Sequence, residues 1–545
     1  MKYLTSIFFS ITDSIYLSKF RWLIFTLFTL LFRLPYYLFS EKRMHGDEAF
    51  LWLSNQNNLD GYDVTLHPFN HDYLGMTDFL FTIPFLPFFG NSGIANQLGL
   101  TLVYLLSAFL LVSISENVFS KSVGKLTFFL TLLPSSFIMI MSATYHGGHF
   151  TASVIGLMAI YFIFQIDSQK GNRNYLYSIL VGFFFLLSYY TSHLNVLMLL
   201  VGFPIFFYQL VSIFKFNLKV LSGLILALAF GCIFGYVPEI LGKIYRVVEP
   251  THNKDVTVPG FMFAQNNLFV LLKYGIESIS GILSHPYMRY YGFQVNKNLG
   301  LFIKIFAYIN LLGFVVGFLT FRLVKGLKDK TIKISDNRLI FFIFYVILLG
   351  GNCLALVAIS KNVDDFGIRY LMPVAIFSPI MVAWAWTELA SISLILQRIV
   401  VTVFFLLTLG GYITGYTKPA LYTFEGSPGS KEVYAYFEEK KIHFSFSNHW
   451  LAYNLIKLSG QKHLSSPAIE LMGGMNYPGL HKKVLDASKK EKIAFAQMIG
   501  VIPAWFDFIK KDNLGQYIDI PEGKYRILEE SQIDRWKIYI VESIP

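Results

Sequence analysis

The densest group of polar side chains in this sequence lies in the segment 41–93. It contains the stretches R-M-H-G-D-E-A-F (43–50), L-D-G-Y-D (59–63) and H-P-F-N-H-D-Y-L-G-M-T-D-F-L (67–80). Asp47 and Glu48 begin an amphipathic stretch, EAFLWLSNQNNL, of the kind that lies along a membrane surface. Asp47 is expected to cap this helix, because Asp accepts orphan backbone N–H groups, or to face a substrate. The two roles are compatible.

Charged residues are scarce inside the apolar runs of the chain. Arg33, Glu239 and Lys304 fall toward one end of their runs, and Glu388 lies near an end of another. Buried acids and bases at mid-membrane are typical of ion-coupled transporters. The concentration of polar residues in loops therefore favours chemistry at the membrane surface over ion-driven transport.

Composition decides the class of protein. Of the 545 residues, 54% are hydrophobic and 14% charged, against about 25% charged in ordinary soluble proteins. With 55 Phe and 33 Tyr, the chain has too little polar surface for a soluble multidomain enzyme, a disordered chain or a coiled coil. It is expected to be an integral membrane protein embedded in the lipid bilayer. The formal charge of +11 then reflects Lys and Arg in cytoplasmic loops rather than a nucleic-acid partner.

About eleven apolar runs are long enough to cross a bilayer. They lie near 22–40, 94–115, 126–143, 150–166, 175–192, 194–213, 219–240, 299–324, 339–360, 370–390 and 399–416. With a cytoplasmic N-terminus, Lys and Arg gather in the inner loops, for example Lys170 with Arg173 and Lys215 with Lys219. The segments 41–93, 241–298 and everything after about 417 are then outside.

The composition changes at residue 417. Residues 1–416 form the multispanning domain, whereas 417–545 carry more charge and shorter runs. Strand-like segments are expected around 442–446, 492–500, 524–530 and 535–543, and a helix-like segment at 448–460 ending at Gly460. The sequence therefore predicts a polytopic α-helical membrane protein with a small C-terminal α/β domain outside the membrane.

Several local motifs, taken in order, resemble the GT-C glycosyltransferases, bacterial relatives of protein mannosyltransferases and aminoarabinose transferases. A first span, a turn with Asp-Glu and an interfacial helix are followed by further matching segments. These are Y-L-G-M-T-D-F-L-F-T-I-P-F-L-P-F-F-G (73–90), Y-H-G-G-H (145–149), Y-T-S-H-L (190–194), R-Y-L-M-P (369–373) and W-L-A-Y-N-L-I-K-L-S-G (450–460). Tyr190 and His193 depart from the family's Trp-Thr-Ser-Pro-Leu turn.

The resemblance implies inverting transfer, in which an acceptor hydroxyl attacks the anomeric carbon of a sugar while a lipid phosphate leaves. A carboxylate must orient or deprotonate that hydroxyl, and cations must take the charge that grows on the phosphate. By position in the motifs, Asp47 takes the first acidic role and Asp78 the second, where relatives often have Glu. Glu48 supports them. Asp78 could equally cap the helix that follows.

Two arginines are candidates for binding the donor phosphate. Arg369 stands at the outer mouth of a span, and a guanidinium matches phosphate oxygens in a fork. It could equally be an interfacial arginine paired with Asp364 or Asp365, or one that touches lipid headgroups. Arg289, within H-P-Y-M-R-Y-Y (285–291), is a second candidate, although this aromatic-rich stretch also fits an interface belt.

No metal ligands are assigned. Six residues expected outside could gather around an ion, but none has a dedicated spacing such as H-E-x-x-H: His45, His67, His71, Asp72, His146 and His149. Some GT-C enzymes use a divalent cation and others do not. A divalent cation therefore stays open as a cofactor, and no other cofactor is expected.

The resemblance implies a multi-pass enzyme of the cytoplasmic membrane. It would move a sugar from a polyprenyl-phosphate donor to a lipid, glycan or protein acceptor of the cell envelope, at the outer face. One alternative is a polymerase or ligase of lipid-linked glycans, which would share the topology but usually relies on outer-loop arginines. Others are a lipid-glycan flippase or transporter, which needs a polar path across the membrane, and a non-catalytic scaffold.

The predicted topology can be tested with a reporter that is active only outside the cytoplasm. Fused after Pro545, it is expected to be active, because about eleven spans with the N-terminus inside place the C-terminus outside. An inactive reporter at normal expression would mean that the number of spans is wrong by one.

Overall fold

The structure is a computed structural model of the 545-residue chain. It describes residues 10, 12–39, 46–60, 66, 74–134, 136–145, 147–248, 313–333, 336–359, 371–417, 429–467, 478–499, 509–512, 515–520 and 523–544. Most of the segment 241–298, including Arg289, lies outside these residues, as does Arg369. The side chain of Asp47 is also outside the description.

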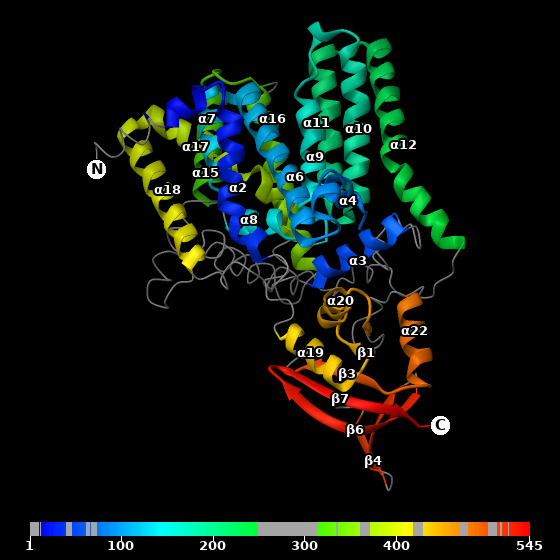
Figure 1. Cartoon of the computed structure of the whole chain (residues 1–545). Helices are drawn as coiled ribbons and strands as arrows, with labels where there is room; N and C mark the ends of the chain where they lie inside the picture. Colours follow the sequence, from blue (N-terminus) through cyan, green and yellow to red (C-terminus); the bar gives the residue numbers. More distant parts are fainter. Residues whose placement is uncertain are drawn as a thin grey trace.

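Apolar helices form a bundle, and a smaller domain lies beyond one of its ends (Figure 1). The bundle and the short helices at that end comprise α2 (Arg21–Phe39), α3 (Gly46–Asp60), α4 (Thr77–Thr82), η1 (Ile83–Phe85), α5 (Leu86–Phe89), α6 (Gly93–Ile114), η2 (Ser115–Phe119), α7 (Lys121–Leu132), α8 (Ser136–Ala143), α9 (His149–Ile163), η3 (Ser168–Lys170), α10 (Arg173–Thr191), η4 (His193–Asn195), α11 (Val196–Phe214), α12 (Leu218–Val248), α15 (Gly313–Lys328), α16 (Asn337–Ile359), α17 (Met372–Ile392) and α18 (Leu394–Thr417).

Helices occupy most of the described parts of the predicted apolar runs. Among the described residues, four helical stretches are long and apolar enough to cross a membrane: Gly93–Phe119, His193–Phe214, Leu218–Ile244 and Met372–Ile392. Shorter apolar helices cover Thr77–Phe89, His149–Ile163, Asn337–Asn352 and Leu394–Phe404. The helical membrane architecture agrees with the sequence, and the count of about eleven spans stays a prediction.

The run 126–143 was expected to be one helix, and this expectation is wrong. α7 ends at Leu132 and α8 begins at Ser136. Pro134 explains the break, because proline disfavours the helical conformation of the residue before it and has no N–H to donate. Leu133 accordingly leaves the helical region, with φ −117° and ψ 73°.

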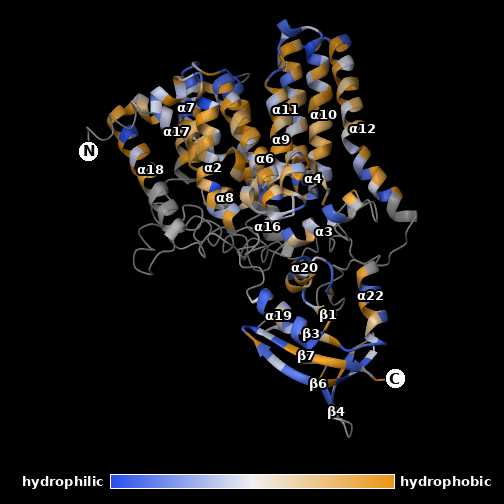
Figure 2. Ribbon diagram, in the orientation of Figure 1, coloured by the Kyte–Doolittle hydropathy of each residue, from blue (hydrophilic) through white to orange (hydrophobic). Residues whose placement is uncertain are grey.

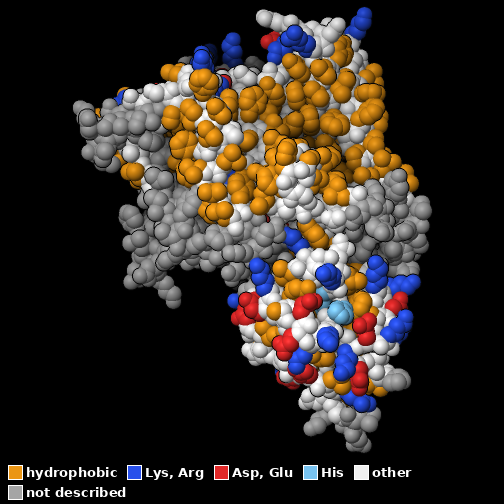
Figure 3. Space-filling model, viewed as in Figure 1, with side chains coloured by type: hydrophobic (Ala, Val, Ile, Leu, Met, Phe, Trp, Pro, Cys, Tyr) orange, Lys and Arg blue, Asp and Glu red, His pale blue; other side chains and the backbone are white. Residues whose placement is uncertain are grey.

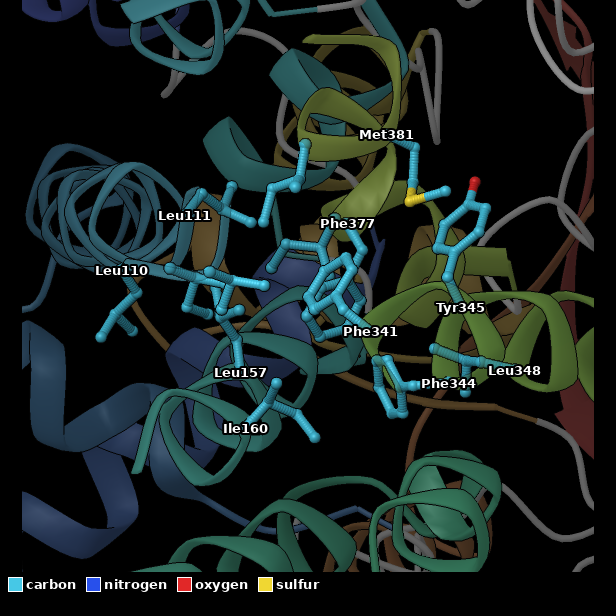
Figure 4. Close-up of a cluster of buried hydrophobic side chains, with 14 of the residues drawn as sticks. Leu110, Leu111, Leu157, Ile160, Phe341, Phe344, Tyr345, Leu348, Phe377 and Met381 are labelled. Atoms are coloured by element: carbon cyan, nitrogen blue, oxygen red, sulfur yellow. The ribbon is translucent and has the colours of Figure 1, made fainter. Parts of the chain in front are cut away.

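The core of the bundle lies where α6, α9, α16 and α17 meet, and Figure 4 shows it. Without water between helices, such contacts are stabilised by close van der Waals packing. α10 and α12 approach especially closely, because a Cβ at Gly231 would lie 2.0 Å from the Ile179 carbonyl oxygen. The buried side chains labelled in Figure 4 are Leu110, Leu111, Leu157, Ile160, Phe341, Phe344, Tyr345, Leu348, Phe377 and Met381.

The outside of the bundle is apolar, as a lipid-facing surface must be. Figures 2 and 3 show a broad hydrophobic surface over the helices, whereas charged side chains of both signs cover the smaller domain. On α12, Leu226 is 71% exposed and Ile233 62%. The connections from α9 to α10 and from α11 to α12, which hold Lys and Arg, lie at the end of the bundle away from the smaller domain (Figure 1).

Residues 429–544, here called the C-terminal domain, contain a mixed sheet flanked by helices. The sequence predicted β1, α20, β3, β6 and β7 but not the other elements. The described elements are α19 (Ser430–Lys440), β1 (Phe444–Ser447), α20 (His449–Leu458), β2 (Leu464–Pro467), α22 (Pro478–Ser488), β3 (Ile493–Met498), β4 (Ile509–Asp512), β5 (Gly515–Ile520), β6 (Gly523–Ile533) and β7 (Trp536–Ser543).

The described strands form one seven-stranded sheet in the order β2-β1-β3-β7-β6-β5-β4. β1 is parallel to β2 and β3, with Ser445 opposite both Ser465 and Ala494. Each neighbouring pair in the run β3-β7-β6-β5-β4 is antiparallel. α20 begins after Asn448, whose side chain accepts a hydrogen bond from the Leu451 N–H at 2.9 Å. Its predicted end is also correct, since Gly460 follows with φ +58°.

α3 joins the C-terminal domain to the bundle. Its residues Ala49, Phe50 and Leu53 belong to a buried cluster with Tyr453 of α20 and core residues of the sheet. The rings of Phe50 and Tyr453 have centroids 4.9 Å apart. The helix that carries Asp47 is therefore part of the hydrophobic core of the C-terminal domain.

Phe50→Ala is expected to weaken this junction. Removing a buried Phe side chain costs about 3–5 kcal/mol, so the thermal unfolding temperature of the purified protein should fall. Leu59→Ala, at a half-exposed position of the same helix, is the matched control and should have little effect. Equal shifts for the two variants would contradict the role given to the cluster.

Candidate active site at the end of the bundle nearest the C-terminal domain

Asp78 lies in the first turn of α4 and is 3% exposed. Its Oδ1 accepts a hydrogen bond from the Thr151 hydroxyl of α9, which is fully buried. The residue before α4 is Met76, and no side chain caps that helix. The capping interpretation of Asp78 is therefore wrong, because its carboxylate is directed to another helix.

The backbone around Asp78 is fixed by the turn after α10. Leu74 forms a β-bridge with Ser192, and the Gly75 N–H donates to the Thr191 carbonyl oxygen at 3.1 Å. The hydroxyls of Thr77 and Thr191 share a hydrogen bond of 2.7 Å. Residue 75 must be glycine, since a Cβ there would lie 2.6 Å from Cε1 of Tyr190. Two motifs noted in the sequence thus meet here.

Residues 147–149 of the Y-H-G-G-H motif also border the site, next to α4 and the turn after α10. Gly148 has φ +69°, a conformation that favours glycine. A Cβ on Gly148 would also lie 3.0 Å from Oδ2 of Asp78. This glycine therefore lets the backbone turn tightly against the carboxylate. The next residue, His149, is buried, and its Nδ1 lies 2.9 Å from the Ser192 hydroxyl.

Burial dominates the electrostatics of Asp78. Oδ2 has no hydrogen-bond partner among the described residues. Loss of hydration raises the pKa of Asp78 to about 6, against the opposing effect of the Thr151 hydrogen bond. A carboxyl group with such a pKa exchanges protons near neutral pH, which suits acid–base chemistry.

α3 is brought toward the same site. Leu51 of α3 packs with Met76, Leu100 and Tyr145 in one buried cluster. Glu48 is buried one turn before Leu51, on the same side of the helix. α3 begins at Gly46, so Asp47 lies within its first turn, where a carboxylate interacts favourably with the helix dipole.

The other predicted site residues are not described. Arg369, Arg289, His45, His67, His71, Asp72 and His146 all lie outside the described residues. Within the described ranges, no three His, Cys, Asp or Glu side chains gather in a way that could hold a metal ion.

Sequence reasoning missed a polar cluster beside the site. His193, noted only as a departure from the family motif, has its Nε2 3.3 Å from Oε2 of Glu239. Glu239 is fully buried in α12 and is also paired with Lys243 at 3.0 Å. Tyr189 stacks on His193 with ring centroids 4.3 Å apart. The available signal was Glu239 itself, an acid within an apolar run.

Arg33 was also assigned no role, and the structure buries it completely. Its guanidinium lies over the Tyr104 ring, 4.4 Å from the centroid, and donates to the Thr101 hydroxyl at 3.2 Å. It also donates to the carbonyl and hydroxyl oxygens of Ser142. Arg33 therefore ties α2 to α6 and α8.

Comparisons with known proteins identify the fold. No protein-family model matches the sequence, and comparison with curated proteins gives no match. ArnT from Cupriavidus metallidurans bound to undecaprenyl phosphate is similar in structure, with a TM-score of 0.54 and 13% identity, over 96% of this chain and 98% of that chain.

The oligosaccharyltransferase of Archaeoglobus fulgidus has the same architecture. Its complex with Zn and sulfate gives a TM-score of 0.50 at 12% identity, over 82% of this chain and 62% of that chain. The form tethered to an acceptor peptide containing the NVT sequon also has a TM-score of 0.50 at 12% identity. This match covers 88% of this chain and 69% of that chain. ArnT and this oligosaccharyltransferase are members of the GT-C superfamily, so the fold of this chain is the GT-C fold.

Asp78→Asn is expected to raise the thermal stability of the protein at neutral pH. Because the pKa of Asp78 is raised to about 6, the native state favours the neutral carboxyl group. The stability that the neutral Asp78 carboxyl group contributes is fully present below the ordinary pKa of Asp. This stability is lost as the pH rises toward 6. The gain from Asn should be small near pH 4 and reach about 3 kcal/mol above pH 6. Unfolding temperatures over this pH range test it, and a gain independent of pH would contradict the assignment.

Proposed function

We propose that this protein is a membrane glycosyltransferase that uses a polyprenyl-phosphate sugar as donor. The observation that carries the proposal is the buried Asp78 carboxylate at the end of the bundle nearest the C-terminal domain. It belongs to a fold shared along almost its whole length with a protein bound to undecaprenyl phosphate. The reaction takes place at the outer membrane surface.

The transfer is an inverting displacement. The acceptor hydroxyl oxygen forms a bond to the anomeric carbon, and the bond from that carbon to the phosphate oxygen breaks. The phosphate leaves with the bonding electrons. Asp47 accepts the hydroxyl proton, since it lies in the first turn of α3, where the helix N-terminus favours a carboxylate.

Asp78 and Glu48 complete the acidic side of the site. Asp78 takes the second acidic role beside Asp47, and Glu48, buried on α3, supports Asp47. Arg369, with Arg289 as the second candidate, takes the charge that grows on the departing phosphate, since a guanidinium can bind two phosphate oxygens at once. The C-terminal domain, which shares its core with α3, helps to hold the acceptor.

The deciding experiment is incubation of the purified protein with a panel of polyprenyl-phosphate sugars, scored for free polyprenyl phosphate. Release with one sugar and an added acceptor is the expected result. A parallel panel of lipid-linked oligosaccharides tests transfer of whole glycans, and translocation of labelled lipid in vesicles tests a flippase. Activity confined to either of these arms would overturn the proposal.

Asp47→Asn is expected to leave a stable but nearly inactive protein. Asn occupies a helix terminus about as well as Asp does, but it has no basic carboxylate, and loss of a general base typically costs on the order of 10²–10⁴-fold in rate. Transfer rates and unfolding temperature are measured together.

Asp167→Asn is the matched control for this variant. Asp167 accepts a hydrogen bond from the Gln169 N–H in the connection between α9 and α10, away from the site. Asn can accept the same bond, so this variant should retain both transfer and stability. Near-normal transfer by Asp47→Asn would remove Asp47 from the mechanism.

A further inference from the structure

Asp78 and Thr151 form a buried hydrogen bond between two helices in the described part of the site. The two residues are 73 positions apart and both are buried, and the Thr151 hydroxyl donates to Oδ1 of Asp78. Among the described residues, Thr151 is the side chain that hydrogen-bonds this carboxylate. The other oxygen, Oδ2, faces the turn at Gly148.

The backbone of Asp78 is held by different interactions. The Gly75 N–H and the Thr77 hydroxyl fix the start of α4 to Thr191, and the Thr82 hydroxyl donates to the Asp78 carbonyl oxygen within the same helix. Removing the Thr151 hydroxyl therefore leaves α4 in place. It frees only the orientation of the carboxylate.

We propose that Thr151 is a positioning residue, which holds the Asp78 carboxylate by Oδ1 and so fixes the orientation in which Oδ2 faces the turn at Gly148. This inference rests on the proposed function for the role of Asp78 in transfer. Hydroxyl hydrogen bonds to carboxylates are strong and directional, and a donated hydrogen bond stabilises the charged form more than the neutral acid. Thr151 thereby also keeps Asp78 ionised in a site that otherwise favours the neutral acid.

Among the groups around Asp78, the Thr151 hydroxyl lowers the pKa of this carboxyl group most strongly. Facing groups that titrate are His149 of α9, whose Nδ1 pairs with Ser192, and Tyr190 at the end of α10. Glu48 approaches on α3, and His193 is paired with Glu239. α6, which packs along α4, has no charged residue between 93 and 102. The Thr151 hydrogen bond lowers the pKa of Asp78, whereas burial raises it.

The test compares Thr151→Val, which removes the hydroxyl at constant shape, with Thr151→Ser, which keeps it. Thr131→Val is the matched control, because the buried Thr131 hydroxyl bonds only backbone carbonyls of its own helix. Each full-length variant is made with and without Asp78→Asn. The pH dependence of the difference in unfolding temperature within each pair then reports the ionisation of Asp78 without any assay of transfer.

The quantity compared is the unfolding temperature of the protein with Asp78 minus that of its Asp78→Asn partner. It should fall with pH and level off near pH 6 in the wild type, in Thr151→Ser and in Thr131→Val. In Thr151→Val it should continue to fall to a pH about one unit higher, because the charged carboxylate has lost a hydrogen bond. The same profile in Thr151→Val and in the wild type would overturn the proposal. If the Val variant does not fold, Thr151→Ala takes its place in the comparison.

Transfer kinetics supply the second readout. With an active donor from the panel, Thr151→Val should lower kcat by roughly tenfold with little change in KM. The acid limb of its pH profile should move up as the stability profile does, and Thr151→Ser should restore both. A shifted stability profile with unchanged transfer would overturn the positioning role. Wild-type protein inactive with every donor would instead contradict the proposed function, while the stability profiles still test the contact.

Discussion

The burial of one carboxylate, Asp78, against two turns is the constraint on which the end of the bundle nearest the C-terminal domain depends. A buried carboxylate is costly unless its oxygens are satisfied, and Asp78 has only one oxygen bonded among the described residues. The backbone segments around Asp78 are held in place by hydrogen bonds to one another. The chain before α4, the turn after α10 and the Gly147–Gly148 turn all interlock around it.

Polar contacts in the described part of the bundle are separated from the lipid-facing surface. Exposed side chains on helices such as α12 are apolar, whereas polar groups gather where helices end. Glu239 illustrates the rule, because it is buried next to His193 and Lys243 rather than exposed to lipid. The bundle thus forms an apolar frame, and polar contacts gather at its ends.

Much of the architecture could be predicted from the sequence, because hydropathy and the positions of Lys and Arg are strong signals for membrane helices. The motifs around Gly75, Gly148 and Thr191 were found, since tight turns restrict the residues they accept. Thr151 was not found, because one hydroxyl in an apolar run has no distinguishing pattern. The break at Pro134 was missed because the hydropathy of the run continues across it, and the capping role of Asp78 failed because its partner lies 73 residues away.

α3 belongs to two hydrophobic cores at once. Leu51 packs into the bundle, and its neighbours Ala49, Phe50 and Leu53 pack into the sheet domain. The physical border between the two parts of the protein therefore runs through this helix and not through the chain segment after α18. Chimeras that exchange the C-terminal domain between relatives at that segment would separate α20 from the helix it evolved with. A workable exchange has to carry the buried face of α3 along, so α3 and the C-terminal domain are inherited as one unit.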